Sequence, residues 1–313
     1  MKKILVTGSN GQIGFGLVQH LRKIYGAENV VATDIRKVPG PVSEGGPFEV
    51  LDVRDGRAMT ERLSSAKADT VIHLAGVLSA KSEADPQLAW DTNMNGLYTA
   101  LEAARANGCA LFFPSSISAF GRTTPAKNTP QDTIQRPSTI YGAAKVAGEL
   151  LCDYYHLKYG MDTRGVRFPG LISYSALPGG GTTDYAVHIY REAAAKGKYT
   201  SYIGKGTYMP MMYMPDALDA VVRLMEADPR KLRHRNSFNV AAMSFEPEEI
   251  AASIRQVIPD FTLAYDVDPV RQAIAESWPD SLDCSAAKAE WGFSPRYDLD
   301  SMTREMLANM PKA

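Results

Sequence analysis

A glycine-rich segment between an apolar run and a helical pattern constrains the fold of this chain more than any other feature. Residues 7–14 read TGSNGQIG, which places Gly8, Gly11 and Gly14 three residues apart. The apolar run just before them is typical of a buried parallel strand. Residues 12–25 carry apolar side chains on one helical face. Glycines at such a strand-to-helix turn permit a tight turn, close approach of a phosphate and close helix packing. The segment therefore predicts a phosphate-binding turn at the N-terminus of the first helix.

An aspartate at the end of the second strand indicates what the phosphate belongs to. Asp34 ends the strand predicted for residues 29–34 and lies 20 residues after Gly14. A carboxylate at this place accepts hydrogen bonds from the ribose hydroxyls of an adenine dinucleotide and repels a 2′-phosphate. We therefore expect NAD as the cofactor, with Ile35 and Arg36 next to the adenosine. Two alternatives stay open: an unrelated turn with a solvated aspartate, and NADP held through Arg36.

Strand and helix patterns alternate along the first half of the chain. Further strands are predicted at residues 48–53, 69–76, 109–116 and 163–170, and long helices at 86–107 and 138–159. This alternation predicts an α/β fold with a doubly wound parallel sheet of the Rossmann type.

The pattern changes after residue 170, and we expect a smaller second region there. Residues 178–184 form a glycine-rich turn that opens a helix, 236–241 resemble a core strand, and the proline-punctuated remainder predicts short irregular elements. The expected division is a nucleotide-binding core at residues 1–170, to which 215–242 return, and a mainly substrate-binding, non-contiguous cap at 171–313.

The carboxyl ends of the parallel strands supply the other expected cofactor contacts, because ligands bind at that edge of such a sheet. Asp52 and Val53 end the third strand, and Leu74, Ala75 and Gly76 end the fourth. The expected NAD-binding set also includes residues of the glycine turn and one after the sixth strand: Gly8, Asn10, Gly11, Gln12, Ile13, Gly14 and Leu171.

A tyrosine and a lysine lie four positions apart in the helix predicted for residues 138–159. Tyr141 and Lys145 share one helix face at that spacing. A free phenol has a pKa of about 10, but a neighbouring ammonium and a positively charged nicotinamide favour the phenolate and lower that pKa. We therefore expect Tyr141 to take a proton from an alcohol whose carbon passes a hydride to the nicotinamide. Lys145 is expected to bind the nicotinamide ribose as well. Ser115 and Ser116, at the end of the fifth strand, are expected to hold the substrate oxygen.

These segments together resemble the extended, epimerase-like branch of the short-chain dehydrogenase/reductase superfamily. The resemblance rests on TGSNGQIG, Asp34, LDV at 51–53, HLAG at 73–76, PSSISAFG at 114–121 and YGAAK at 141–145. It implies a catalytic set of a serine, Tyr141 and Lys145, with Ser116 as the main hydroxyl and Ser115 as its neighbour; the reverse order stays open. It also implies that Asn93 lies near NAD and supports the lysine through water. The alternative for Asn93 is a packing residue inside its helix.

The later segments narrow the substrate class. Members of this branch mostly act on nucleotide sugars and need a cationic clamp for the diphosphate, yet residues 171–216 hold one arginine and three lysines. The Met-rich stretch YMPMMYMPDA at 208–217 stands there instead, either as part of a pocket or as simple core. Three further segments share with it a resemblance to the short-chain type of L-threonine 3-dehydrogenase: LPGGGTTDYA at 177–186, NVAAMSF at 239–245 and ESWP at 276–279.

This second resemblance implies NAD-dependent oxidation of the Cβ hydroxyl of L-threonine to 2-amino-3-oxobutanoate. Backbone N–H groups of the 179–184 turn are expected to bind the substrate carboxylate. The expected substrate-binding set, besides Ser115, Ser116 and Tyr141, is Ser79, Gly180, Thr182, Thr183 and Trp278. The alternative for the two threonines is helix capping, and the alternative for the tryptophan is core packing.

Two other functions stay open. The first is a nucleotide-sugar epimerase or dehydratase of the same branch, which would bind a UDP- or dTDP-sugar tightly. The second is a non-catalytic regulator that senses NAD. The intact set of Ser116, Tyr141 and Lys145 argues against the regulator, because such a protein has no need of it.

Composition limits the partners and the compartment. The formal net charge of −1 gives no footprint for nucleic acid or an anionic membrane, so a small amino-acid substrate is expected. Three scattered cysteines predict reduced thiols in a cytoplasmic protein, and five dispersed histidines predict no metal site. No apolar run approaches the ~20 residues of a membrane span. The first strand starts near Lys3, so no cleaved leader is expected. The family resemblance implies a homodimer, or a larger homo-oligomer, that pairs the helices near 86–107 and 138–159.

Overall fold

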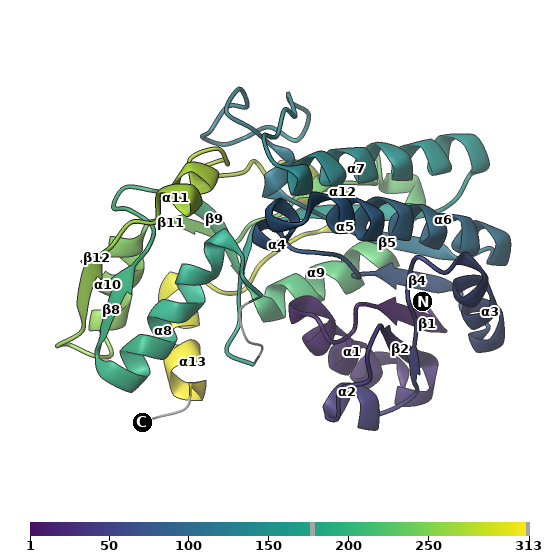
Figure 1. Ribbon diagram of the computed structural model, residues 1–313, viewed down its shortest axis with the longest axis horizontal. Coiled ribbons are helices and arrows are strands. Elements are labelled where there is room, and N and C mark those ends of the chain that lie inside the picture. The colour runs from purple at the N-terminus through teal and green to yellow at the C-terminus, as the bar shows by residue number, and fades with distance from the viewer. Residues whose placement is uncertain (176–178, 311–313) are drawn as a thin grey trace.

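A parallel sheet forms the centre of the larger part of the molecule. The computed structural model describes residues 1–175 and 179–310, and within them seven strands follow the order β10-β6-β5-β4-β1-β2-β3 (Figure 1). Every neighbouring pair in this sheet is parallel. The strands are β1 (Ile4–Thr7), β2 (Val30–Asp34), β3 (Phe48–Val50), β4 (Thr70–His73), β5 (Ala110–Ser116), β6 (Thr163–Phe168) and β10 (Phe238–Asn239). The predicted doubly wound α/β fold is confirmed.

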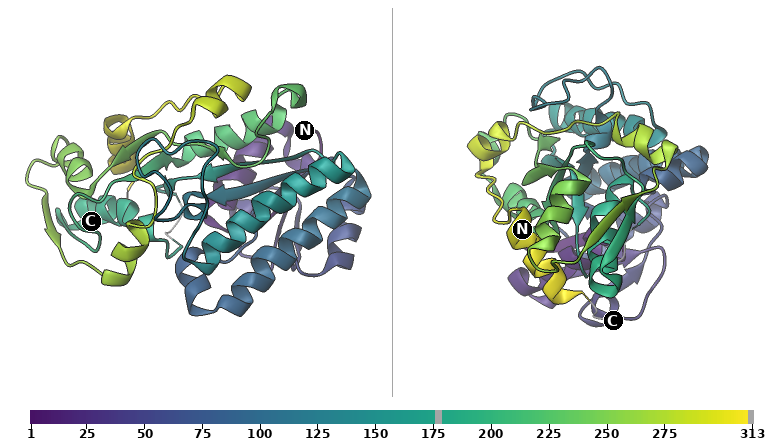
Figure 2. Two further views of the ribbon diagram at one scale, coloured as in Figure 1. Left: turned by 90° about the horizontal axis from the view of Figure 1, so that it is seen from above. Right: turned by 90° about the vertical axis from the view of Figure 1, so that its left-hand side faces the viewer.

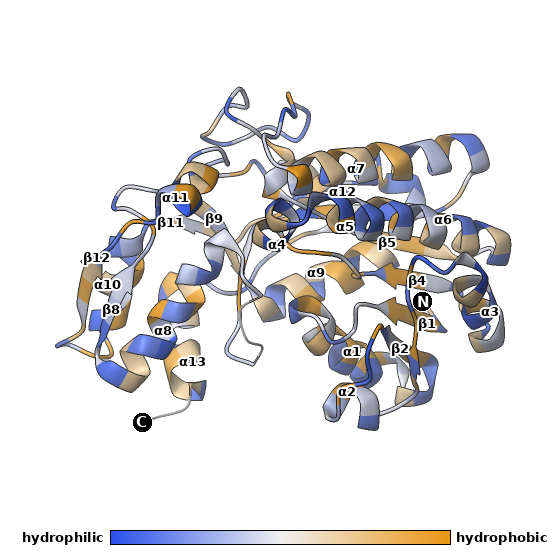
Figure 3. Cartoon of the chain, viewed as in Figure 1, coloured by the Kyte–Doolittle hydropathy of each residue, from blue (hydrophilic) through white to orange (hydrophobic). Residues whose placement is uncertain are grey.

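The order of the strands reverses between β1 and β4, which are neighbours although β2 and β3 separate them in the chain. Ligands bind such sheets at the carboxyl ends of the strands, at this reversal. All residues of β1 and β4 are buried, and Figure 3 shows both strands as hydrophobic. The ligand-binding crevice of this sheet is therefore expected at the turns that follow β1 and β4.

Helices cover both faces of the sheet. On one face α6 and α7 lie side by side (Figure 2), and on the other α1 packs against α9. The helices of this part are α1 (Gln12–Tyr25), α2 (Pro41–Glu44), α3 (Gly56–Ala66), α4 (Ser79–Ala84), α5 (Pro86–Trp90), α6 (Gly96–Asn107), α7 (Ile140–Tyr159) and α9 (Met214–Glu226). The helix predicted for 86–107 forms as α5 and α6 joined by a π-helical turn at Asp91–Asn95.

The remaining elements form the smaller part of the molecule, on the left of Figure 1. A three-stranded sheet joins β7 (Gly170–Ile172), β9 (Met209–Tyr213) and β11 (Met243–Phe245), and a two-stranded sheet joins β8 (Lys198–Ser201) and β12 (Thr262–Tyr265). The helices here are α8 (Tyr185–Lys196), α10 (Pro247–Arg255), α11 (Pro269–Ala275) and α13 (Leu299–Asn309). The exception among the remaining elements is α12 (Ser285–Trp291), which lies near α7 in Figure 1 and packs against β10 of the large sheet.

Two predictions about these elements were wrong. The strand predicted for 163–170 is two strands, since β6 ends at Phe168 and β7 joins the other sheet. Pro169 stands between them, and it has no N–H to continue the ladder. The remainder after residue 246 contains four helices and a strand, because Pro247 and Pro269 occupy the first positions of α10 and α11. Pro259, Pro279 and Pro295 lie outside the helices.

Candidate active site

The glycine turn brings three parts of the backbone into contact. Gly8 has a φ of +65°, and a Cβ on it would lie 2.6 Å from the Ala75 nitrogen. A Cβ on Gly14 would lie 2.3 Å from the Gly8 carbonyl oxygen. Gly11 precedes α1, whose first N–H groups have no acceptor inside the helix. The turn thus leaves a cradle that only glycine permits, and its free N–H groups fit a dinucleotide pyrophosphate.

Asp34 lies beside this turn at the end of β2. Its Oδ2 accepts a hydrogen bond from the Asn10 N–H at 2.9 Å, and the Asn10 side chain donates to the Arg36 carbonyl oxygen at 2.8 Å. Ile35 and Arg36 are exposed. The carboxylate is therefore held at the rim of the cradle, where an adenosine ribose would lie.

Asp52 takes part in an ion pair that the sequence analysis did not identify. Arg54 binds Asp52 at 2.7 Å and Asp91 at 2.9 Å, and hydrogen bonds from Arg54 hold the pKa of the Asp52 carboxyl below its usual value. Val53 is buried against Gly96, where a Cβ would lie 2.9 Å from a Val53 methyl group. The i, i+2 spacing of an aspartate and an arginine was the available signal. The structure thus places Asp52 at the predicted edge, with its carboxylate already engaged.

Asn93 holds the loop that follows β4. Its Oδ1 accepts from the Val77 N–H at 2.7 Å, and its Nδ2 donates to the Val77 carbonyl oxygen at 3.1 Å. Gly76 passes so close that a Cβ would lie 3.0 Å from this Oδ1. Leu74 and Ala75 are partly exposed in the same loop. The side-chain amide of Asn93 therefore positions backbone. Asn93 and Lys145 line one small cavity, and the support of the lysine by Asn93 through water stays a prediction.

Two other predicted cofactor residues meet across the two parts of the molecule. The Gln12 side chain donates to the Leu171 carbonyl oxygen at 3.3 Å, which links the start of α1 to β7. Ile13, the next residue of α1, is partly buried against the larger hydrophobic core.

Ser116, Tyr141 and Lys145 meet where β5 ends and α7 begins. Thr139 caps α7 by accepting the Gly142 N–H at 3.0 Å, which sets the helix start one residue before the tyrosine. The Ser116 hydroxyl accepts the Ser118 N–H at 3.2 Å. The same side chain lies near enough to the Tyr141 phenol to lower its pKa. The Lys145 ammonium lies 5.3 Å from the centre of the Tyr141 ring. The structure thus brings together the three residues predicted to be catalytic.

Burial is the largest influence on the pKa of the Tyr141 phenol in this structure. The expected lowering of that pKa also depends on the charge of the nicotinamide, and it stays a prediction. Burial raises the pKa of the Tyr141 phenol to about 12, and the nearby Ser116 side chain only partly opposes this. The Lys145 Nζ donates to the Pro114 carbonyl oxygen at 2.6 Å and lies 5.3 Å from the centre of the phenol ring. Burial also lowers the pKa of Lys145 to about 8, against the opposing charge of Glu149. Burial is therefore the largest influence on the pKa of each of the two groups.

Ser115 does not face the same site as Ser116, which favours Ser116 as the main hydroxyl. Its side chain is buried, and its hydroxyl donates to Glu149. Arg167 forms a two-pronged pair with the same carboxylate at 3.0 and 2.9 Å, and Gln135 donates to it at 2.8 Å. Adjacent residues of a strand point to opposite faces, so only one serine can reach the tyrosine. The i, i+4 spacing from Lys145 was the signal for Glu149, which the sequence analysis missed.

In the glycine-rich turn before α8, two of the N–H groups that were expected to bind the substrate carboxylate are engaged within the turn. Both Asp184 carboxylate contacts are internal, since its Oδ2 accepts the Gly180 N–H at 2.8 Å and the Gly181 N–H at 2.7 Å. An acidic side chain three residues after a turn glycine was the available signal. Thr182 is buried, and Thr183 packs against Gly170. The Gly180 and Gly181 amides are therefore already satisfied, and Asp184 rather than a threonine caps this end.

Two further predicted substrate residues are buried in the structure. Ser79 begins α4 and is 7% exposed. Trp278 is 8% exposed and belongs to the larger hydrophobic core, which favours its core-packing alternative.

The cysteines and the groups of possible metal ligands were compared with the expectation of reduced thiols and no metal site. Cys109, Cys152 and Cys284 are free and buried. In residues 1–175 and 179–310 no group of three histidine, cysteine, aspartate or glutamate side chains is arranged to hold a metal ion. Among the helices of this described part, none is both long and apolar enough to cross a bilayer.

A family model, curated relatives and solved structures each match nearly the whole chain or most of it. The family model described as "NAD dependent epimerase/dehydratase family" matches residues 4–241. An uncharacterized epimerase/dehydratase of Staphylococcus aureus (strain MRSA252) is 59% identical over 309 residues, which cover 98% of this chain and 96% of that one. The solved structure of an L-threonine dehydrogenase from Clostridium difficile is 59% identical, with a TM-score of 0.98 and coverage of 99% and 98%. A GalE-like L-threonine dehydrogenase from Cupriavidus necator, in its holo form, is 47% identical, with a TM-score of 0.95 and coverage of 98% and 99%.

The cradle at α1 and the carboxylate of Asp34 fit an adenine dinucleotide. The family model that matches residues 4–241 describes NAD-dependent proteins. The chain belongs to the NAD-dependent epimerase/dehydratase family, within the extended short-chain dehydrogenases, and its cofactor is NAD.

Proposed function

We propose that this protein oxidises the Cβ hydroxyl of L-threonine to 2-amino-3-oxobutanoate with NAD. The observation that carries the proposal is the meeting of Ser116, Tyr141 and Lys145 at the carboxyl edge of the sheet. Two similar solved structures, at 59% and 47% identity over nearly the whole chain, are described as L-threonine dehydrogenases.

The three side chains divide the work on the alcohol. Ser116 orients the substrate hydroxyl, and Tyr141 takes its proton as the carbonyl forms. Lys145 holds the cofactor ribose and supplies positive charge beside the phenol ring. When bound, NAD would supply the acceptor for the Cβ hydrogen and its electron pair, and the positive charge of the nicotinamide would favour the Tyr141 phenolate over the buried phenol.

The smaller part of the molecule supports a small substrate. The Met-rich stretch of β9 and the start of α9 is buried, so it forms core and leaves no polar wall for a diphosphate. Lys196, one of the few cations of residues 171–216, is paired with Glu192 at 2.7 Å. A sugar diphosphate would need cations that this segment does not offer.

The direct test is NADH formation with L-threonine, D-threonine, L-allo-threonine and L-serine measured side by side. We expect substantial turnover of L-threonine alone. Absence of NADH with all four, together with strong thermal stabilisation by a UDP- or dTDP-sugar, would instead support the epimerase or dehydratase.

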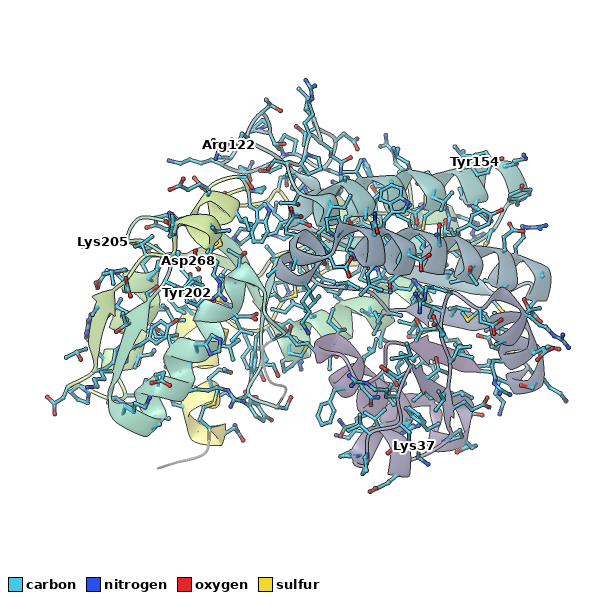
Figure 4. The ribbon with its side chains drawn as sticks, in the orientation of Figure 1. Lys37, Arg122, Tyr154, Tyr202, Lys205 and Asp268 are labelled. Atoms are coloured by element: carbon cyan, nitrogen blue, oxygen red, sulfur yellow. The ribbon has the colours of Figure 1, made fainter. Side chains whose placement is uncertain are left out.

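We also propose that two copies associate through α6 and α7. Leu150, Tyr154 and Leu157 follow one another on the outer face of α7 with 61, 46 and 83% of their surfaces exposed. Figure 4 shows Tyr154 pointing outward from this helix. On α6, Tyr98 is 53% exposed. A row of exposed apolar side chains on neighbouring helices is typical of a helix-to-helix interface.

A cytoplasmic location is proposed on the state of the cysteines. All three are free thiols inside the protein, with no disulfide to suit an oxidising compartment. Cell fractionation with an antibody to the chain tests this proposal.

A further inference from the structure

A short helix ties the loop that follows β4 to the start of α7. Helix α4 packs against α7, at the end of α7 that carries Tyr141 (Figure 1). Glu83, on α4, accepts the Ile140 backbone N–H at 2.8 Å through its Oε1. Ile140 is the first residue of α7 and directly precedes Tyr141. The Glu83 carboxylate therefore holds the chain next to the residue that is proposed to take the proton.

The first N–H groups of α7 need acceptors from outside the helix, because no preceding helical turn supplies them. Two side chains provide such acceptors. Thr139 accepts the Gly142 N–H at 3.0 Å from within the same segment, and Glu83 accepts the Ile140 N–H from a different one. The negative charge of Glu83 also suits the positive end of the helix dipole. Tyr141 lies between the two residues that are held in this way.

The other end of this link is the loop that was predicted to contact the cofactor. The Ser82 side chain on α4 is buried, and its hydroxyl donates to the Val77 carbonyl oxygen at 3.1 Å. Both hydrogen bonds of the Asn93 amide hold the same Val77, at 2.7 and 3.1 Å. The side chains of Asn93, Ser82 and Glu83 thus connect the loop beside the glycine turn with the start of α7.

We propose that Glu83 is a positioning residue for Tyr141, which it serves by fixing the first turn of α7 from α4. A proton acceptor must lie within about 2.6–3.2 Å of the atom that loses the proton. A misplacement of about 1 Å can cost about 10²-fold in rate. Burial and the Ser116 side chain are the influences on the pKa of the Tyr141 phenol. Glu83 therefore acts on Tyr141 through the position of the helix and not through its charge.

The bond itself can be tested without turnover. Hydrogen exchange of the full-length protein, resolved to single residues by mass spectrometry, should show the Ile140 N–H protected in the wild type. It should stay protected in Glu83→Gln, whose side-chain oxygen still accepts. In Glu83→Ala the same N–H should exchange about tenfold faster, because it has lost its acceptor. Equal exchange in the three proteins would overturn the proposal.

The kinetic part rests on the proposed oxidation of L-threonine. Glu83→Ala should lower kcat by about tenfold. Its KM for NAD should be unchanged, because Asn93 still holds the cofactor loop. Glu83→Gln should retain the wild-type kcat. The pH profile of kcat should stay in place in both variants, and a profile that moves would contradict the inference that Glu83 acts through position.

Asp298→Ala is the matched control. Asp298 is another exposed carboxylate at a helix N-terminus, where it accepts the Ser301 N–H at 2.8 Å and caps α13. Helix α13 carries none of the candidate site residues, so this variant should keep the wild-type kcat. Equal kcat in Asp298→Ala and Glu83→Ala would make Glu83 an ordinary structural cap. A Glu83→Gln variant as slow as Glu83→Ala would contradict the role of the acceptor oxygen.

The two proposals fail in different ways. Wild-type protein that forms no NADH with any of the four amino acids refutes the threonine assignment, and the hydrogen-exchange result still decides whether Glu83 holds the start of α7. Active wild-type protein with an unprotected Ile140 N–H refutes only the inference about Glu83.

Discussion

Gly14 and Gly8 set the distance between helix α1 and the turn beneath it. Any side chain at Gly14 would place a Cβ 2.3 Å from the Gly8 carbonyl oxygen, closer than atoms approach in folded proteins. The contact is with backbone, which cannot rotate away. The helix would have to move from the sheet, and the N–H groups that face the cofactor would move with it.

The Gly14→Ala variant should therefore bind NAD at least about tenfold more weakly, in line with the roughly 1–3 kcal/mol that overpacking costs. Calorimetric titration with NAD measures this. Gly56→Ala is the control, because its Cβ would meet only a Thr99 methyl group at an ordinary 3.5 Å. Equal NAD affinity of the two variants would contradict the cradle.

Glu149 affects the active site through charge, one helical turn after Lys145. Its carboxylate raises the pKa of the lysine, which burial lowers to about 8. Glu149→Gln removes the negative charge, so the ammonium should lose its proton at lower pH. The alkaline limb of the pH–rate profile should move down, while exposed Glu61→Gln should leave it in place. A limb that moves to higher pH would contradict the inference that the Glu149 charge raises the pKa of Lys145.

The π-helical turn between α5 and α6 is the element that positions the loop after β4. A π turn adds one residue to a helical turn and often occurs at functional sites. Here it carries Asn93, whose amide makes both of its hydrogen bonds to Val77. The loop with Ala75 and Gly76 is thereby fixed against the glycine turn.

Asn93→Ala leaves both Val77 groups without their partner and should lower the free energy of unfolding by about 1–3 kcal/mol. Urea denaturation measures the change. Asn95 lies in the same turn, but its amide bonds the exposed Asp91, so Asn95→Ala should cost less than about 0.5 kcal/mol. Similar losses in the two variants would show that the loop is held by other contacts.

At the scale of the whole molecule, the reversal of strand order between β1 and β4 directs the cofactor turn, the β5 serine and the start of α7 to one edge. The link from Gln12 to Leu171 then joins that edge to the smaller part. The opposite surface of α6 and α7 is left free to contact a second copy.

The proposed dimer makes a prediction at this scale. Leu157→Glu places a charge at the most exposed apolar position of α7 and should convert dimers to monomers in light scattering. Val270→Glu, which is 68% exposed on α11 in the smaller part, should leave the mass unchanged. A wild-type protein that is already monomeric would refute the interface.

The sequence predicted those features that depend on neighbouring residues. The glycine turn, Asp34 and the Tyr141–Lys145 spacing are local patterns, and their strand-to-helix contexts were recognisable. The features that the sequence did not predict depend on contacts between distant segments of the chain. The engagement of Gly180 and Gly181 by Asp184, the turning of Ser115 toward Glu149 and Arg167, and the burial that raises the pKa of Tyr141 all arise from packing that one pattern does not encode.

The most direct test of the account is turnover of L-threonine by Tyr141→Phe, with NAD affinity measured on the same preparation. The substitution removes only the hydroxyl, so the account predicts unchanged NAD binding and a kcat lower by about 10²–10⁴-fold. A variant that binds NAD and turns over within about threefold of the wild type would show that another group takes the proton.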